Sequence, residues 1–253
     1  MYDLPFVLDG FPILDRCVLR PDELGVLEEA LVRGSQSAPK REILIVHGYN
    51  GAGKSWLAAD FSTRHRQDFG AIFWVNCATK SQLQKSWANI ARRVAEECLS
   101  EEEAGKDDES PLTDLIGWFN KKDNNRWLII FDNVDQVGSS QSPDDFDIME
   151  YLPTADHGSI LITTTQQKLL DRLQAKSLHL KGLKFEQGRE LLGYYFSNDE
   201  VTKEREKGLS ISTRSQKFRS LSHKLRGSFL FQSLVGFPQA DKTSIASENA
   251  DLH

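Results

Sequence analysis

Residues 48–55 read Gly48-Tyr49-Asn50-Gly51-Ala52-Gly53-Lys54-Ser55, and they fit the pattern G-x-x-x-x-G-K-S. An apolar run, Ile43–Val46, directly precedes this stretch, and a helical pattern, Trp56–Phe61, directly follows it. In a strand, glycine-rich turn and helix of this kind, backbone N–H groups converge on a phosphate. The glycines leave those groups unobstructed, and the helix N-terminus adds partial positive charge. The stretch therefore predicts a phosphate-binding loop at the end of a strand.

Two side chains of the loop, together with a distant acid, predict a nucleotide polyphosphate and a metal ion as ligands. We expect Lys54 to neutralise the β- and γ-phosphates and the Ser55 hydroxyl to ligate Mg²⁺. Far downstream, the apolar run Leu128–Phe131 ends in Asp132. A carboxylate at the end of a buried strand is held rigidly, so Asp132 is expected to hold Mg²⁺ through its water shell.

The residues after Asp132 bear on hydrolysis. In hydrolytic enzymes with this loop, an acid commonly sits beside the metal-binding aspartate to polarise the attacking water, and here that position is Asn133. Because asparagine cannot take up a proton, we expect slow hydrolysis unless Asp135 or another group serves as the base. A third run, Ile160–Thr165, ends in hydroxyls that either sense the γ-phosphate or reflect the high strand propensity of threonine.

Apolar runs rich in β-branched residues alternate with amphipathic stretches, and this alternation predicts an α/β fold with a doubly wound parallel sheet. The expected strands are Ile43–His47, Ala71–Asn76, Trp127–Asp132, Ser159–Thr164 and Ser177–Leu180. The expected helices are Asp22–Val32, Ser55–His65, Lys80–Cys98, Leu112–Asn120 and roughly Phe146–Tyr151. After Leu180 the pattern becomes helical, at Phe185–Phe196 and Arg214–Gly227. We therefore expect a nucleotide-binding domain over 1–175, a small helical subdomain over 176–240 and a polar tail over 241–253.

Composition argues against two classes of partner. The chain has 253 residues, with 31 Lys and Arg against 37 Asp and Glu, which gives a net charge of −6. That balance argues against a general electrostatic grip on nucleic acid or anionic lipid. The apolar runs are too short to span a membrane, and Asp3 and Asp9 interrupt the N-terminus where a signal peptide needs an apolar core. We expect a cytoplasmic protein that binds neither nucleic acid nor membrane.

Taken in order, these segments resemble the NB-ARC family of signal-transduction (STAND) P-loop ATPases, and most of all its fungal NLR-like members. The resemblance covers roughly residues 15–240. It rests on Val18–Leu24, the loop itself, Ala71–Asn76, Asp132–Asp135, Gly158–Thr165, Leu178–Leu192 and Gly236–Pro238. Leu19 replaces a usual glycine, and Thr165 stands where the family usually has an arginine that senses the γ-phosphate. The chain ends soon after Pro238, so the resemblance implies a truncated member.

The resemblance implies the fold of a P-loop NTPase, with ADP or ATP bound together with Mg²⁺. Its implied nucleotide contacts are Val18, Leu19 and Arg20 at the adenine, Gly48, Asn50, Gly51, Ala52, Gly53, Lys54, Ser55 and Trp56 around the phosphates, Thr165 near the γ-phosphate and Pro238 on the adenine. Lys54, Asp132 and Asp135 are the implied catalytic residues, and Ser55 and Asp132 the metal ligands.

The function implied by the resemblance is that of a nucleotide switch module of an NLR-like signalling protein, with weak or no hydrolysis. Its partners would be NB-ARC-containing relatives or a second copy of the chain. Two alternatives stay open. One is a truncated interaction or decoy module in which nucleotide is only structural. The other is a catalytic P-loop enzyme, either an active ATPase or a small-molecule kinase.

Overall fold

The computed structural model of the protein describes residues 4, 18–33, 40–98, 111–135, 146–184, 186–188 and 190–191. The chain divides into two compact units, Met1–Lys181 and Gly182–His253. Of the expected helix over 185–196, residues 186–188 and 190–191 are described, and they are helical. The expected helix over 214–227, Pro238, and the tail over 241–253 lie outside the described residues.

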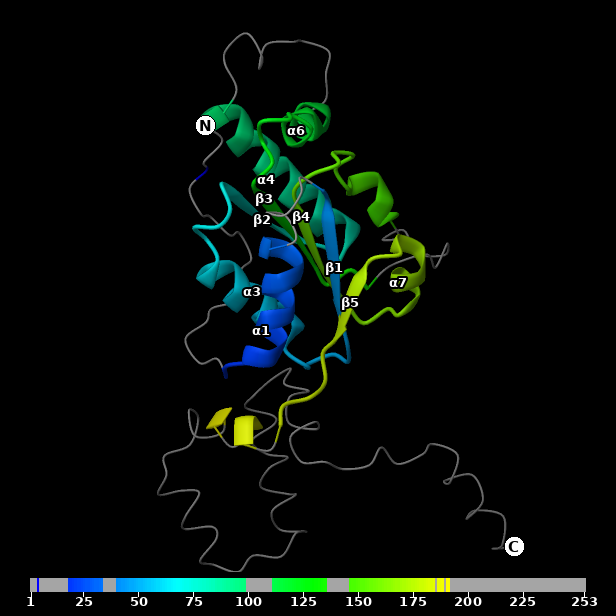
Figure 1. Ribbon diagram of the computed structural model, residues 1–253. Helices are drawn as coiled ribbons and strands as arrows, with labels where there is room; N and C mark the ends of the chain where they lie inside the picture. Colours follow the sequence, from blue (N-terminus) through cyan, green and yellow to red (C-terminus); the bar gives the residue numbers. More distant parts are fainter. Residues whose placement is uncertain are drawn as a thin grey trace, which may run out of the picture. The chain divides into compact units, whose positions relative to one another are not determined.

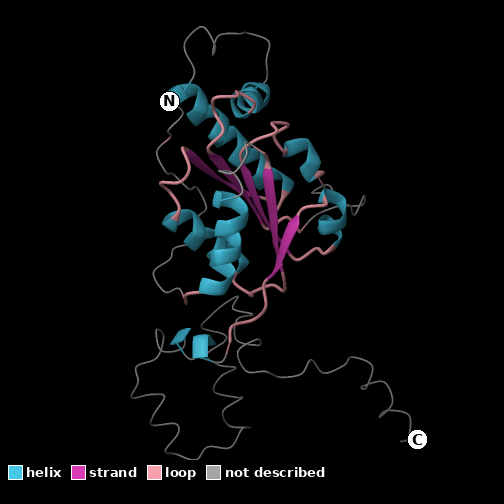
Figure 2. Ribbon diagram, in the orientation of Figure 1, coloured by secondary structure: helices cyan, strands magenta, loops and turns pink. Residues whose placement is uncertain are grey.

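Within the described residues of the first unit, a parallel five-stranded sheet confirms the predicted α/β fold (Figures 1 and 2). Its strands are β1 (Glu42–His47), β2 (Ala71–Asn76), β3 (Trp127–Asp132), β4 (Ser159–Thr164) and β5 (Lys176–His179). The spatial order is β2-β3-β4-β1-β5, and every neighbouring pair is parallel. Strand β5 pairs with β1, and the first unit runs on to Lys181.

The helices follow the predicted pattern with three differences. They are α1 (Pro21–Glu28), α3 (Lys54–Arg64), α4 (Lys80–Cys98), α6 (Pro111–Phe119) and α7 (Lys168–Leu173). The single helix expected over 22–32 is α1 followed by a π-helical turn, η1 (Glu29–Arg33). The helix expected over 146–151 is one 3₁₀ turn, η2 (Ile148–Tyr151), and α7 was not predicted. None of the helices in the described ranges combines the length and the apolar character that a membrane span requires.

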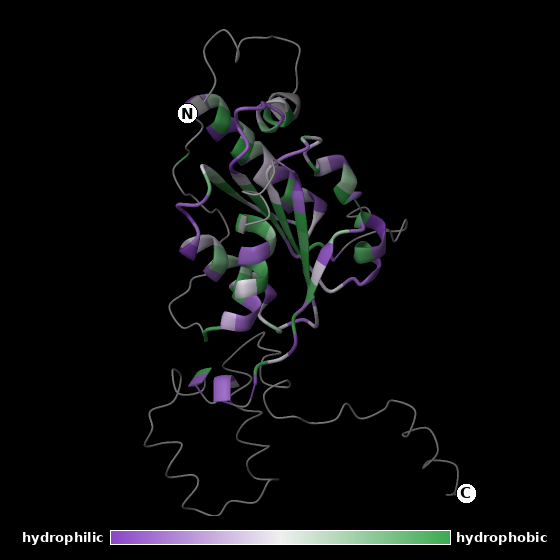
Figure 3. Ribbon diagram, in the orientation of Figure 1, coloured by the Kyte–Doolittle hydropathy of each residue, from purple (hydrophilic) through white to green (hydrophobic). Residues whose placement is uncertain are grey.

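Helices cover both faces of the sheet, as a doubly wound fold requires. Successive side chains of a strand point to opposite faces, so Trp127, Ile129 and Phe131 of β3 pack with α4 and α6, whereas Leu128 and Ile130 pack with α1 and α3. In Figure 3 the middle of β1 is hydrophobic, while β5, the exposed edge strand, is mostly hydrophilic. The sheet interior therefore forms a rigid base for the loops at its ends.

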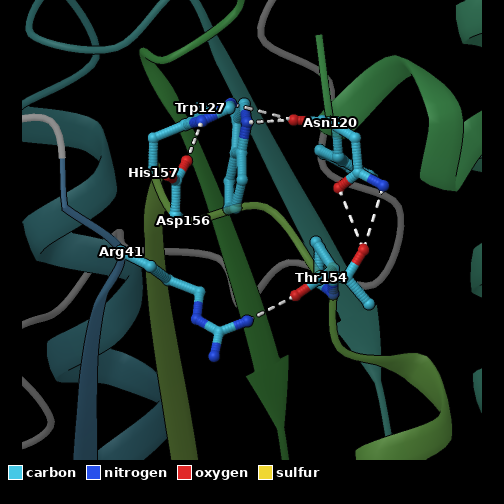
Figure 4. Close-up of polar contacts among 8 residues, drawn as sticks. Arg41, Asn120, Trp127, Thr154, Asp156 and His157 are labelled. Carbon is cyan, nitrogen blue, oxygen red and sulfur yellow. Dashed lines mark hydrogen bonds and ion pairs between the residues drawn. The ribbon is translucent and has the colours of Figure 1, made fainter. Parts of the chain in front are cut away.

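A polar network joins the end of α6 to the amino ends of β3 and β4 (Figure 4). The Trp127 indole donates to the Phe119 carbonyl at 3.3 Å, and Nε2 of the buried His157 lies 3.1 Å from the same oxygen. Arg41 donates to the Pro153 carbonyl at 2.7 Å. These bonds satisfy carbonyl groups at a helix end and in a loop, and His157 is a packing residue of this network.

Candidate functional site

The loop over 48–53 leaves β1 at the carboxyl edge of the sheet, where ligands of parallel α/β folds bind. Gly51 and Gly53 have φ angles of 78° and 94°, in the left-handed region that favours glycine. Gly48 is needed for a different reason. A Cβ atom added there would lie 2.4 Å from the backbone oxygen of Leu180, just beyond β5. The edge strand therefore limits the residue at the start of the loop to glycine.

The loop leads directly into α3, and the N-terminus of this helix has no side-chain cap. Gly53 is the N-cap residue, no side chain caps the helix, and its first turn contains no acidic residue. The first N–H groups of a helix have no intrahelical partner, and together with the helix dipole they favour an anion. The local backbone thus fits the phosphate expected from the sequence.

Lys54 lies under this loop. Its side chain is buried, and Nζ donates to the carbonyl oxygens of Gly48, at 3.0 Å, and Tyr49, at 3.1 Å. Burial lowers the pKa of Lys54 from its usual value, while the nearby carboxylates of Asp135 and Asp132 act in the opposite direction. An ammonium group held by two loop carbonyls is a fixed positive charge for a bound polyphosphate.

Asp132 is the centre of the polar contacts at the end of β3. Its Oδ1 accepts hydrogen bonds from Ser55 Oγ at 2.7 Å and Thr163 Oγ1 at 2.6 Å, and its Oδ2 accepts from Asn133 Nδ2 at 3.0 Å. Burial raises the pKa of the Asp132 carboxyl, and the hydrogen bonds from Thr163 and Ser55 oppose that rise. The two oxygen ligands predicted for Mg²⁺ are therefore in direct contact.

The turn after β3 is fastened to the end of β4. Asn133 adopts a left-handed conformation with φ 63°, which asparagine tolerates better than most residues. Its N–H donates to Thr163 Oγ1 at 2.9 Å. Asp135 Oδ1 accepts from the Thr165 N–H at 2.6 Å, and Thr164 Oγ1 lies 3.3 Å from the same oxygen. The sequence left open whether the threonine hydroxyls at the end of β4 sense the γ-phosphate. In the structure, the hydroxyls of Thr163 and Thr164 bond to the end of β3 and the turn after it, and Thr165 contributes its N–H.

Arg20, at the N-cap of α1, contacts the loop through its side chain. Its buried guanidinium donates to the Ala52 carbonyl at 2.8 Å through Nη2 and to the Lys181 carbonyl at 3.0 Å through Nη1. Val18 is buried and Leu19 is 53% exposed. The segment expected at the adenine is therefore joined to the phosphate-binding loop by its arginine.

The remaining expected residues lie in different surroundings. Asn50 is exposed in the loop, Trp56 is half-buried in the first turn of α3, and Pro238 lies outside the described residues. Sequence reasoning missed the Thr163 bond to Asp132. It also missed the stacked rings of His47 and His179, whose centroids are 4.8 Å apart at the ends of β1 and β5. Both contacts depend on strand register, which no local motif encodes.

Comparison with protein families gives one clear result, a match of residues 22–202 to the NB-ARC domain. No curated protein gives a significant match.

Among solved structures, the chain is similar to a Signal Transduction ATPase with Numerous Domains (STAND) protein with a tetratricopeptide repeat sensor from Pyrococcus horikoshii. The identity is 18% and the TM-score 0.49, over 94% of this chain and 33% of the other. It is also similar to the Aeropyrum pernix ORC2 protein in ADPNP-ADP complexes, with 15% identity and a TM-score of 0.47 over 73% and 53%. A third similar structure is Drosophila ORC bound to DNA, with 14% identity and a TM-score of 0.48 over 74% and 48%. The chain thus spans about a third of the STAND protein and about half of each of the other two.

Proposed function

The chain belongs to the NB-ARC family, and from this premise we propose that it is a nucleotide-dependent switch module that binds ADP or ATP with Mg²⁺ at the loop after β1. One observation carries the proposal. Ser55, in the first turn of α3, and Asp132, at the end of β3, are 77 residues apart in sequence, yet their side chains are hydrogen-bonded beside the buried Lys54. A loop lysine, a hydroxyl and a strand-end carboxylate are the groups that Mg²⁺-nucleotide binding needs.

The residues of the site fit both a polyphosphate and a Mg²⁺ ion. The glycine backbone, the uncapped helix and the Lys54 ammonium suit a polyphosphate. Within the described residues, no cluster of three or more His, Cys, Asp or Glu side chains could hold a metal. Mg²⁺ often binds through one or two protein oxygens plus phosphate and water, and Ser55 and Asp132 would supply the protein ligands. When bound, the ion would neutralise charge on the β- and γ-phosphates.

We propose that hydrolysis is slow at most. The Asn133 amide donates to Asp132 and cannot accept a proton from water. Asp135 has one oxygen bonded to the Thr165 N–H, and we assign it to holding this turn in place. Asp135 is therefore a poor candidate for the base that the sequence left open.

The adenine end of the site remains an inference from the family. We propose that Val18 and Leu19 contact the base, since Arg20 joins their segment to the loop, that Pro238 packs on the adenine, and that Thr165 lies near the γ-phosphate. The proposed partners are NB-ARC-containing relatives or a second copy of this chain, in the cytoplasm. The net charge of −6 supports a site for free nucleotide rather than a nucleic acid.

Calorimetric titration of ADP and ATP, with and without Mg²⁺, tests the proposal. We expect saturable binding that Mg²⁺ strengthens, at least about tenfold discrimination between ADP and ATP, and at least about tenfold weaker binding by Lys54→Met. Lys122→Met is the matched control, because Lys122 is an exposed lysine before β3. A switch also needs differential affinity, so equal affinities for ADP and ATP would favour the purely structural use of nucleotide. No saturable binding of either nucleotide would refute the proposal.

A further inference from the structure

Arg20 is a buried arginine whose guanidinium is directed at backbone carbonyls of two other segments. It is 6% exposed, and it donates to Ala52 O at 2.8 Å and to Lys181 O at 3.0 Å. The carboxylate of Glu23 lies 3.6 Å from Nη1. Charge-assisted hydrogen bonds from a planar guanidinium fix both distance and direction, and burial shields them from water. Arg20 therefore holds the phosphate-binding loop and the chain after β5 in a defined relation.

The bond to Ala52 determines the direction of an N–H group in the loop. The described residues contain no cis peptide bond, and a trans peptide unit is planar with its N–H opposite its C=O. With the Ala52 oxygen held by Arg20, the N–H of Gly53 points away from Arg20. Gly53 is conformationally permissive at φ 94°, so without this bond the orientation of the peptide plane between Ala52 and Gly53 is less restricted. Arg20 thus preorganises a donor at the helix N-terminus, where an anion binds.

The bond to Lys181 connects the same guanidinium to the end of the first unit. Leu180 N–H donates to the His47 carbonyl at 2.8 Å, immediately before the loop begins. Lys181 follows, and it is the last residue of the unit. A movement of the Ala52 carbonyl is therefore transmitted, through one rigid planar group, to the backbone where the chain leaves the sheet.

We propose that Arg20 is a positioning residue that orients the Ala52–Gly53 peptide toward a bound polyphosphate and couples occupancy of the loop to the backbone at Lys181. The inference rests on the proposed function, because it assumes that the loop binds a nucleotide polyphosphate. It differs from the role implied by family resemblance, in which residues 18–20 contact the adenine. The two roles are separable, because inorganic pyrophosphate has phosphates but no adenine.

The experiment is a calorimetric titration of the full chain with ADP and with inorganic pyrophosphate, both with Mg²⁺, for wild type, Arg20→Met and Arg20→Lys. Arg92→Met is the matched control. Arg92 is 65% exposed on α4, and its replacement removes the same charge at a position far from the loop in sequence. We expect Arg20→Met to lower the affinity for ADP and the affinity for pyrophosphate by the same factor, about tenfold or more. Arg20→Lys keeps the charge but loses the planar fork, so it should lower the affinities for ADP and pyrophosphate by one smaller factor, about threefold or more. If Arg20→Met does not fold, the Arg20→Lys result tests the proposal in its place.

Hydrogen exchange of the segment 178–184 supplies the second readout. Pyrophosphate should increase its protection in wild type and in Arg92→Met, but not in Arg20→Met. A loss of ADP affinity with unchanged pyrophosphate affinity would assign Arg20 to the adenine and overturn the inference, as would unchanged affinity for both. If wild type itself binds neither ligand, the proposed function fails, and this inference fails with it.

Discussion

Replacing Asp132 by asparagine is expected to stabilise the ligand-free protein while it removes most of the magnesium-dependent nucleotide affinity. The carboxylate is 6% exposed, and burial raises its pKa even though the Ser55 and Thr163 hydroxyls and the Asn133 amide all donate to it. A raised pKa means that folding penalises the ionised form, by about 1.4 kcal/mol for each pKa unit. Asparagine has almost the same shape and no charge, and its oxygen can still accept from both hydroxyls. Its new N–H group can donate to the Asn133 side-chain oxygen once the Asn133 amide turns over, because Asn133 Nδ2 now donates at that place. We therefore expect the free energy of unfolding in EDTA to rise at neutral pH.

Bound Mg²⁺-ADP is expected to make wild type more stable than Asp132→Asn. At a Mg²⁺-ADP concentration one hundred times its Kd, binding adds about 2.7 kcal/mol to the stability of wild type. If Asp132→Asn binds a hundredfold more weakly, the same concentration adds only about 0.4 kcal/mol. Urea denaturation in EDTA and in saturating Mg²⁺-ADP measures both effects. Asp123→Asn, at an exposed aspartate before β3, is the charge-matched control and should follow wild type in both conditions.

The pH dependence gives an independent check. An acid whose folded pKa lies above its unfolded value of 3.8 destabilises the protein at pH values above the folded pKa. That penalty disappears as the pH falls through the folded pKa toward 3.8, because the native state then takes up the proton more readily than the unfolded state. The stability advantage of Asp132→Asn should therefore shrink on acidification. An Asp132→Asn variant that is less stable than wild type in EDTA at neutral pH would refute this reasoning.

Four further substitutions have expected outcomes. Gly48→Ala forces a Cβ to within 2.4 Å of the Leu180 oxygen, so it should lower stability by about 1–3 kcal/mol and weaken nucleotide binding. Gly25→Ala, in α1 with no atom within 4 Å of the added carbon, should instead gain about 0.5–1 kcal/mol, and equal thermal shifts for the two variants would contradict this. Burial, and then His179, lower the pKa of His47 below 6.5, so the stabilisation from neutral His47 is present above pH 6.5 and lost as the pH falls through the folded pKa. Melting curves from pH 7.5 to 5 should show a smaller loss for His47→Gln than for wild type, and identical losses would rule this out. Asp135→Asn keeps an oxygen that can accept from the Thr165 N–H, so phosphate-release assays should give an unchanged slow hydrolysis rate, whereas a tenfold fall would make Asp135 the base.

The strands were predictable because each is a short run of β-branched and aromatic residues, and each lies within one residue of its expected bounds. Short helices were less predictable than strands. The α7 sequence, Lys168–Leu173, has only six residues, too few to show a helical period. The π-helical turn after α1 buries three consecutive residues, Ala30, Leu31 and Val32, so the apolar pattern alone could not locate the change of helix type.

The candidate site divides in the same way. The loop and Asp132 were predictable because a local motif and a strand end encode them. The contact of Arg20 with Ala52 spans 32 residues, and that of Thr163 with Asp132 spans 31. Such contacts arise from strand order and register, which fix which loop ends are neighbours. Arginine in a charged helix start is usually solvent-exposed, so nothing local indicated that Arg20 would be buried.

The most direct measurement is to purify the protein, denature it and identify any released nucleotide by chromatography, for wild type and for Lys54→Ala. We expect an adenine nucleotide in wild type, in a near-stoichiometric amount, and little or none in the Lys54 variant, whose loop lacks the buried ammonium bonded to Gly48 and Tyr49. Wild type that carries no nucleotide and takes up neither ADP nor ATP on incubation with Mg²⁺ would show that the loop after β1 is not a nucleotide site.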